Sequence, residues 1–173
     1  MKSAFIFGKL PAHGDFIRRG IGEVVAEELD DYLSASLSDA AVLEDFDDLY
    51  ASAPAWRFVA DMGGQVMCGV IAPSVDKVGR QFPILAGVAV PRGEIGIAVD
   101  ACEALLYDAF SQNMNADTLM AALEDFPGGS DGGDPPPSGW FLEDENKVVV
   151  ARLDGNRPPR LLRRMMESAR LQS

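Results

Sequence analysis

The sequence predicts an α/β domain, a three-layer α/β/α sandwich built around a mixed sheet. Its 173 residues, 47% of them hydrophobic, are enough for one domain with a real core. Strand-like apolar runs are interspersed with amphipathic helical patterns, which is typical of α/β folds. The run PILAGVAVP at 83–91 is almost continuously apolar, and it therefore suits a strand that is covered on both faces.

The first predicted elements are a strand and two amphipathic helices. Residues 3–8 form a short aromatic and β-branched run, which predicts a strand. In residues 22–37 apolar side chains recur at helical spacing, and acids fill the opposite face. Residues 40–52 show the same pattern and predict a second helix, which Ser38 or Asp39 could cap.

Three strands are expected in the middle of the chain. Residues 55–62 and 65–73 flank a glycine pair at 63–64, which is a hairpin signal. Residues 74–82 are charged and turn-like, and they lead into the apolar strand at 83–91.

Two helices and a loop follow. Residues 96–112 and 115–126 show helical patterns, and Asn115 or Asp117 could cap the second helix. Residues 127–139 are rich in glycine and proline, which predicts a flexible loop within the domain.

The C-terminal segment predicts a hairpin and a basic helix. The hairpin turns around residues 144–146. The helix covers about residues 157–171, with Pro158 and Pro159 in its first turn.

Charge is distributed unevenly along the chain. The net charge is −12, so we expect no binding to nucleic acid or to anionic lipid. Residues 22–61 and 62–146 each carry −10, whereas residues 2–20 carry +3 and residues 147–173 carry +5. These blocks are explained either by solvated helix faces, by an acidic face that meets a basic partner, or by a basic tail that docks on the acidic region.

Cysteine usage and hydropathy indicate a cytoplasmic protein without a metal site. Cys68 and Cys102 lie in apolar runs, and the chain has no CxxC pair and a single histidine, which argues against zinc. We expect both to be reduced, buried thiols. The apolar stretch at 4–7 is too short for a signal peptide, and no apolar run approaches the roughly 20 residues of a membrane helix.

The stretch FGKLPAHGD at 7–15 looks at first like a phosphate-binding loop. Such a loop needs GxxxxGK followed by serine or threonine, but here Leu10 follows Gly8-Lys9 and no glycine stands five positions before Gly8. A GxGxxG pattern is also missing. We therefore expect neither nucleotide binding nor any other cofactor.

A small hydrolase is an alternative enzyme hypothesis. Ser74 would be the nucleophile, and His13, the single histidine, would have to be the base. No G-x-S-x-G elbow surrounds Ser74, however, and His13 lies in a turn beside Pro11. The simpler reading is that His13 is a turn residue.

Two charged stretches favour binding or structural roles. APAWRF at 53–58 sets a tryptophan beside an arginine at the start of a strand, and PSVDKVGRQFP at 73–83 is a charged loop between two apolar strands. Ser74 and Asp76 could cap this loop, and Arg80 could pair with Asp15 or Asp76. Such pairing would tie the first strand to the hairpin.

Three stretches taken together resemble the TagF family, also called ImpM, of type VI secretion accessory proteins. They are GKLPAHGDFIRRG at 8–20, APAWRF at 53–58 and PSVDKVGRQFPI at 73–84, in the family's order and with similar spacing. The resemblance implies a single TagF-like domain over 1–173, with its motif-bearing part at 1–91 and a three-layer α/β/α fold.

The resemblance also implies a function. TagF-like proteins are bacterial and cytoplasmic, are not known as enzymes, and repress type VI secretion post-translationally by binding a forkhead-associated scaffold protein (Fha). Some members are fused to a phosphatase domain, for which this chain has no room. A structural subunit of the secretion machine is a further alternative, as is the hydrolase with Ser74 and His13.

The family motif gives binding or framework positions but no catalytic residue, metal ligand or cofactor site. These positions are Gly8, Lys9, Pro11, Gly14, Asp15, Phe16, Arg18, Trp56, Arg57, Ser74, Asp76, Gly79 and Arg80. The same match includes Arg19 as an alternative to Arg18, together with Pro54, Phe58, Pro73, Phe82 and Pro83.

Overall fold

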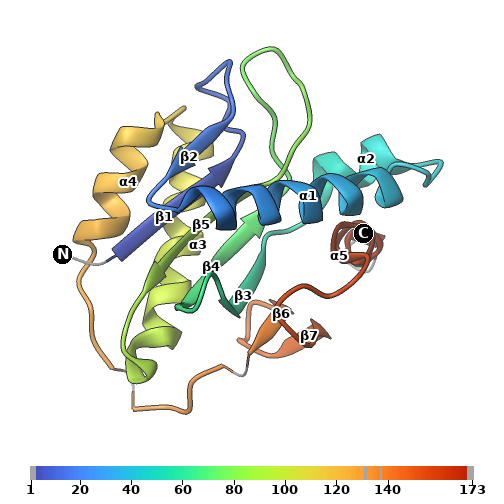
Figure 1. The fold of residues 1–173 in the computed structure, drawn as a ribbon. Helices are drawn as coiled ribbons and strands as arrows, with labels where there is room; N and C mark the ends of the chain where they lie inside the picture. Colours follow the sequence, from blue (N-terminus) through green and yellow to red (C-terminus); the bar gives the residue numbers. More distant parts are fainter. Residues whose placement is uncertain (1–2, 131, 137, 171–173) are drawn as a thin grey trace.

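The computed structural model describes residues 3–130, 132–136 and 138–170 and confirms the α/β class, with helices on both faces of one sheet (Figure 1). The strands are β1 Ser3–Gly8, β2 Ile17–Arg19, β3 Trp56–Asp61, β4 Val66–Ala72, β5 Ile84–Ala89, β6 Gly139–Glu143 and β7 Val149–Leu153. The helices are α1 Glu23–Ala40, α2 Phe46–Ser52, the 3₁₀ turn η1 Arg92–Glu94, α3 Ile95–Ser111, α4 Ala116–Asp125 and α5 Leu161–Ala169.

The sheet has the order β2-β1-β5-β4-β3-β6-β7, and each of these pairings is antiparallel. The expected mixed sheet is therefore corrected to an antiparallel one. Parallel neighbours need long crossover connections. Here β3 and β4, and likewise β6 and β7, are joined by tight hairpins, which fixes them as antiparallel.

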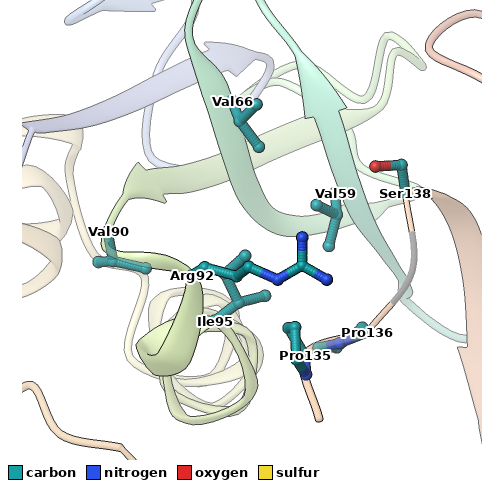
Figure 2. A pocket seen from close by; sticks show the side chains of 8 residues that line it. All are labelled: Val59, Val66, Val90, Arg92, Ile95, Pro135, Pro136 and Ser138. Atoms are coloured by element: carbon teal, nitrogen blue, oxygen red, sulfur yellow. The ribbon is translucent and has the colours of Figure 1, made fainter.

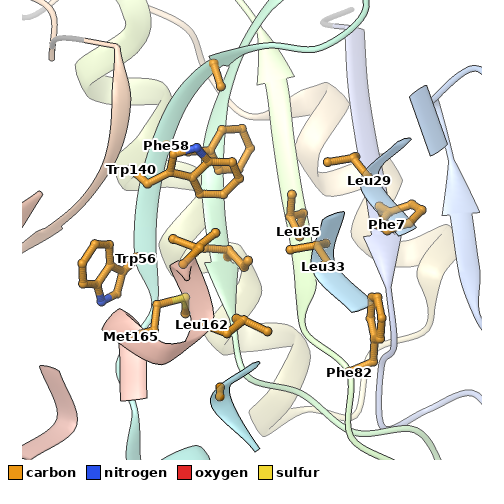
Figure 3. Packing of buried hydrophobic residues seen from close by; sticks show 14 of the residues in the cluster. Phe7, Leu29, Leu33, Trp56, Phe58, Phe82, Leu85, Trp140, Leu162 and Met165 are labelled. Atoms are coloured by element: carbon orange, nitrogen blue, oxygen red, sulfur yellow. The ribbon is translucent and has the colours of Figure 1, made fainter. Parts of the chain in front are cut away.

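Two hydrophobic layers lie on the two faces of the sheet. On one face α1, α2 and α5 cover the side chains of Trp56, Phe58 and Trp140, which are fully buried (Figure 3). On the other face α3 and α4 pack over a second cluster that includes Cys102 and Leu119. The three-layer arrangement is thus the expected one.

The N-terminal helices differ from the prediction at their boundary. Helix α1 continues to Ala40 and buries Ser36 and Ala40, so Ser38 and Asp39 lie inside it and do not cap a second helix. Helix α2 begins only at Phe46. Residues 41–45 form turns between the two helices, and Val42 is 71% exposed, so the predicted helical pattern is realised only from Phe46 onward.

The remaining helices and the C-terminal hairpin form where the sequence predicts them, but the last helix is shorter than expected. Asn115 caps α4, because its side chain accepts the N–H of Thr118 at 2.8 Å. Helix α5 begins only at Leu161, with Arg160 at its N-cap, so Pro158 and Pro159 precede the helix and do not form its first turn as expected. Of the expected helix at 157–171, residue 171 lies outside the described residues, as do positions 131 and 137 of the Gly/Pro loop.

Both cysteines are free and buried, as the apolar runs around them predicted. Burial raises the pKa of Cys68 to about 12, and burial also raises the pKa of Cys102. No helix in the described part of the chain combines the length and hydropathy needed to cross a membrane.

Candidate functional site

Two loops converge at one end of the sheet. The N-terminal loop (residues 9–16) follows β1, and the β4–β5 loop (residues 73–83) precedes β5. Because β1 and β5 are paired neighbours, with Gly8 opposite Ile84, the two loops leave the sheet side by side (Figure 1). A Cβ at Gly8, which has φ +130°, would lie 2.0 Å from the Pro83 carbonyl oxygen, so this junction needs glycine.

Hydrogen bonds join the two loops directly. The Lys77 N–H donates to the His13 carbonyl at 2.7 Å, and the Arg80 guanidinium donates to the Gly14 carbonyl at 2.8 Å. The Ser74 hydroxyl donates to the Lys9 carbonyl at 2.6 Å. The first and third sequence motifs therefore form one structural unit.

The carboxylate of Asp76 organises the β4–β5 loop from inside. It accepts the N–H groups of Val78 and Arg80 at 3.1 and 2.9 Å and the Arg80 Nε at 2.6 Å, and the Lys9 ammonium lies 3.7 Å away. Burial by itself would raise the pKa of Asp76, but these hydrogen bonds and the charge of Arg80 hold that pKa below its usual range. Asp76 is 2% exposed, so it acts on the loop's shape rather than on a partner.

Aromatic side chains anchor both loops to the core. Phe16 of the N-terminal loop packs edge-on against Phe7 and Phe82, with ring centroids 4.9 and 5.0 Å apart. Behind Ser74, the Tyr50 hydroxyl donates to the Ser74 carbonyl at 2.7 Å and accepts the Ser74 N–H at 3.0 Å. Pro11 lies beside this anchor and lines a pocket of about 220 Å³ with Tyr50 and Ser74.

The tips of the two loops form an exposed surface, which we call the loop platform. It consists of Gly14, Asp15 and residues 77–80. Val78 is 73% exposed, and Gly79 has φ +91° at the tip. The carboxylate of Asp15 makes no hydrogen bond or ion pair within the described ranges, so the predicted alternative, an Arg80–Asp76 pair, is the one that forms. Arg18 lies apart from the platform, exposed on β2.

Trp56 and Arg57 do not belong to the platform. Because side chains alternate along β3, the two residues point to opposite faces of the sheet. Trp56 is fully buried, and its indole N–H donates to the Ser168 hydroxyl of α5 at 3.2 Å.

Arg57 is the centre of a charged cluster under α3. Its side chain is 7% exposed, and its guanidinium donates to Asp100 at 2.6 Å and to Glu103 and lies 3.3 Å from the Glu143 carboxylate of β6. Burial alone would lower the pKa of Arg57, but the hydrogen bonds to Asp100 and Glu103 raise it above its usual value. Arg57 therefore ties β3 to α3 and β6.

The geometry does not assemble the pair that a hydrolase would need. The Nε2 of His13 accepts the N–H of Ala116 at 2.9 Å at the start of α4, and the buried Ser74 hydroxyl donates to a backbone carbonyl. Each group is thus committed to a structural hydrogen bond, and His13 is the turn residue that the simpler reading expected.

A pocket of about 260 Å³ lies at the opposite end of the sheet, under the Gly/Pro loop (Figure 2). Valines and prolines line most of it, and Arg92 is its one charged lining residue among the described positions. Among the described residues no second titratable side chain lines this pocket, so it offers no cluster comparable to the platform.

The sequence motifs did not identify Lys77 and Val78 as the residues that face outward. The only sequence feature that could have indicated them is their position beside Gly79 in a charged turn. A surface that contacts a partner needs exposed side chains, and the motif does not distinguish these from hydrogen-bonded ones. The motif residues themselves mostly hold the tip in position.

Comparison with known proteins points to one family. The family model TagF_N, described as the TagF N-terminal domain, type VI secretion system-associated, matches residues 6–126. The crystal structure of PA0076 from Pseudomonas aeruginosa PAO1 has a similar fold, with a TM-score of 0.61 and 22% sequence identity over 98% of this chain and 78% of that one. No curated protein matches the chain significantly.

Proposed function

The chain belongs to the TagF family of type VI secretion system-associated proteins, and on this premise we propose that it restrains secretion by binding the system's forkhead-associated scaffold protein. It would do so in the cytoplasm and without catalysis.

The loop platform is the observation that carries this proposal. The polar groups of the motif residues are hydrogen-bonded within the two loops. Residues 77–80 remain exposed, on a loop whose conformation is fixed by the Asp76 carboxylate. A preorganised loop loses little conformational freedom when a partner binds, so more of the contact energy appears as affinity. Lys77, Val78 and Arg80 offer two cationic groups around one apolar side chain.

A binding measurement on purified proteins tests the proposal. We expect Val78→Asp to weaken binding of the scaffold at least about tenfold, because it places a carboxylate at the centre of the contact. Val24→Asp is the matched control, since Val24 is 69% exposed, close to the 73% of Val78, and lies on α1 away from the platform. Equal binding by both variants and the unchanged chain would refute the platform as the scaffold site.

A test in the bacterium asks whether the function itself is right. Deleting the gene should raise the amount of secreted type VI effector, and restoring the unchanged gene should lower it again. Restoring the Val78→Asp form should leave secretion high although the protein accumulates normally. Secretion that falls after deletion would instead indicate a protein that the machine needs, and it would contradict a repressor.

A further inference from the structure

The two edges of the sheet are built differently. The β2 edge is three residues long and carries the exposed Arg18 and Arg19, and such short, charged edges resist pairing with another chain. The β7 edge begins within the stretch KVVV at 147–150, and Val148, Val149 and Val150 are 55%, 44% and 49% exposed. Within the described residues β7 pairs only with β6, so its outer backbone groups have no strand partner.

A groove runs between this open edge and helix α5. One hollow of about 450 Å³ is bounded by Ala151 of β7 and by Arg164 and Ser168 of α5. A second hollow of about 540 Å³ is bounded by Leu153 of β7 and again by Arg164. Because both hollows share Arg164 and Glu167, we treat them as one feature, the β7–α5 groove, in which the arginines of the described lining outnumber its two acids, Asp154 and Glu167.

Backbone geometry favours an extended occupant. Across residues 151–153 the pairing of β7 with β6 is regular, and the register shifts only between Leu142 and Glu143 of β6. Ala151 and Leu153 are partly buried against the core layer under α5 and give the groove an apolar floor. A chain that added to this edge would gain main-chain hydrogen bonds from β7 and side-chain contacts from the floor.

Charge favours an acidic occupant. Residues 147–173 carry +5 in a chain whose net charge is −12. Arg160 and Arg163 share Asp39 at 3.9 and 3.8 Å, whereas the Arg164 guanidinium forms no hydrogen bond or ion pair in the described part of the chain. An arginine fork of this kind pairs well with a carboxylate.

We propose that an extended acidic segment of a partner protein docks in the β7–α5 groove, adds an eighth strand beside β7 and places a carboxylate on Arg164. The groove lies outside residues 6–126, the part that the family model matches, and it shares no residue with the loop platform. The strongly acidic remainder of the chain opposes a nucleic acid in the same place.

The test selects peptides without presupposing the partner. The folded chain is used to select from a phage-displayed library of random twelve-residue peptides, and the most enriched peptide is synthesised. We expect enriched peptides to alternate acidic with β-branched or aromatic residues. On titration of this peptide into the ¹⁵N-labelled chain, the largest amide shifts should fall in residues 148–153 and in α5.

Two charge-reversal variants then distinguish binding in the groove from nonspecific electrostatic attraction of the peptide. Arg164→Glu should raise the dissociation constant of the selected peptide about tenfold or more. Arg92→Glu is the matched control, because Arg92 is also exposed and lies in η1 at the pocket of Figure 2. It should change the constant less than about twofold.

Several outcomes would overturn the proposal. Enriched peptides without acids, amide shifts centred on the loop platform, or equal binding by the Arg164→Glu chain would each do so. A dimer in light scattering that Arg164→Glu dissociates would assign the groove to a second copy of the chain. A single-stranded RNA that produces the same amide shifts would assign it to nucleic acid. None of these results bears on scaffold binding at Val78, so the two proposals fail separately.

Discussion

The two loops at the motif-bearing end and the C-terminal segment (residues 139–170) contribute to the molecule in different ways. The loops carry the recognisable sequence, and their signature residues are bound to one another by specific polar contacts, as between Asp76 and Arg80. The C-terminal segment lies beyond the matched residues 6–126, yet it extends the sheet by two strands and covers Trp56. A hydrogen-bonded loop demands particular residue types at particular positions, whereas a buried apolar layer can be filled by many combinations.

This comparison predicts that the C-terminal segment is part of one folding unit with the motif-bearing region. The rings of Trp140 and Phe58 lie 4.9 Å apart, and the Leu162 N–H donates to the Ser36 hydroxyl of α1 at 2.9 Å. We infer that the described chain unfolds as a single domain.

The largest expected effect is that of Trp140→Ala. It removes a fully buried indole and leaves a cavity, so we expect a loss of about 3–5 kcal/mol in the free energy of unfolding. Urea denaturation followed by circular dichroism measures it, and Val149→Ala, at a half-exposed position, should change stability by less than about 0.5 kcal/mol. Two separate transitions in the unchanged chain would contradict the single domain.

Arg57→Ala should have the next largest effect, about 2–3 kcal/mol, because it leaves Asp100, Glu103 and Glu143 facing one another without the shared cation. Burial by itself would raise the pKa of Asp100, but Lys147 and Arg57 hold that pKa below its usual value. The stability from this pairing is therefore present above about pH 4, the pKa range of the unfolded group, and is lost as pH falls further.

The difference in stability between the Arg57→Ala chain and the unchanged chain should accordingly shrink below about pH 4. Arg152→Ala is the comparison, since Arg152 pairs with Asp154, which is 85% exposed, and should cost less than about 1 kcal/mol. A loss for Arg57→Ala as small as that for Arg152→Ala would show that the buried cluster contributes little.

Asp76→Asn should have a smaller effect that is confined to the loops. Because the folded pKa of Asp76 is lowered, its stabilising contribution is complete above about pH 4 and declines as pH falls through the folded value. We expect the variant to be less stable than the unchanged chain at pH 7, and the difference to shrink as pH falls below about 4. Amide exchange should speed up in residues 76–80 first, and uniform exchange across the sheet would argue against a local role.

Much of this fold could be predicted because its strands and helices carry strong local patterns. The apolar run of β5, the Gly-Gly hairpin between β3 and β4 and the Asn115 cap are each visible within a few residues. Strand β2 was missed because three residues with two arginines have no alternation to detect. The order and direction of all the strands could not be deduced from the sequence. They depend on which strand β6 pairs with after the chain has passed through α3 and α4, and that strand is β3.

The candidate site was predictable as a pairing of loops but not as a surface. Asp15 and Asp76 are both acids in turns, and only the structure shows that Asp76 is enclosed and Asp15 exposed. Alternation along a strand already implied that Trp56 and Arg57 face opposite layers. Their partners, Ser168 and Asp100, are more than forty positions away in sequence, so no local pattern could name them.

The most direct test of the loop platform measures scaffold binding and thermal unfolding on the same three proteins, the unchanged chain, Val78→Asp and Asp76→Asn. If Val78 contacts the scaffold and Asp76 only supports the loop, Val78→Asp will lose binding at an unchanged melting temperature. Asp76→Asn will lose binding together with stability. Full scaffold binding by Val78→Asp would contradict the account, whatever the melting temperatures are.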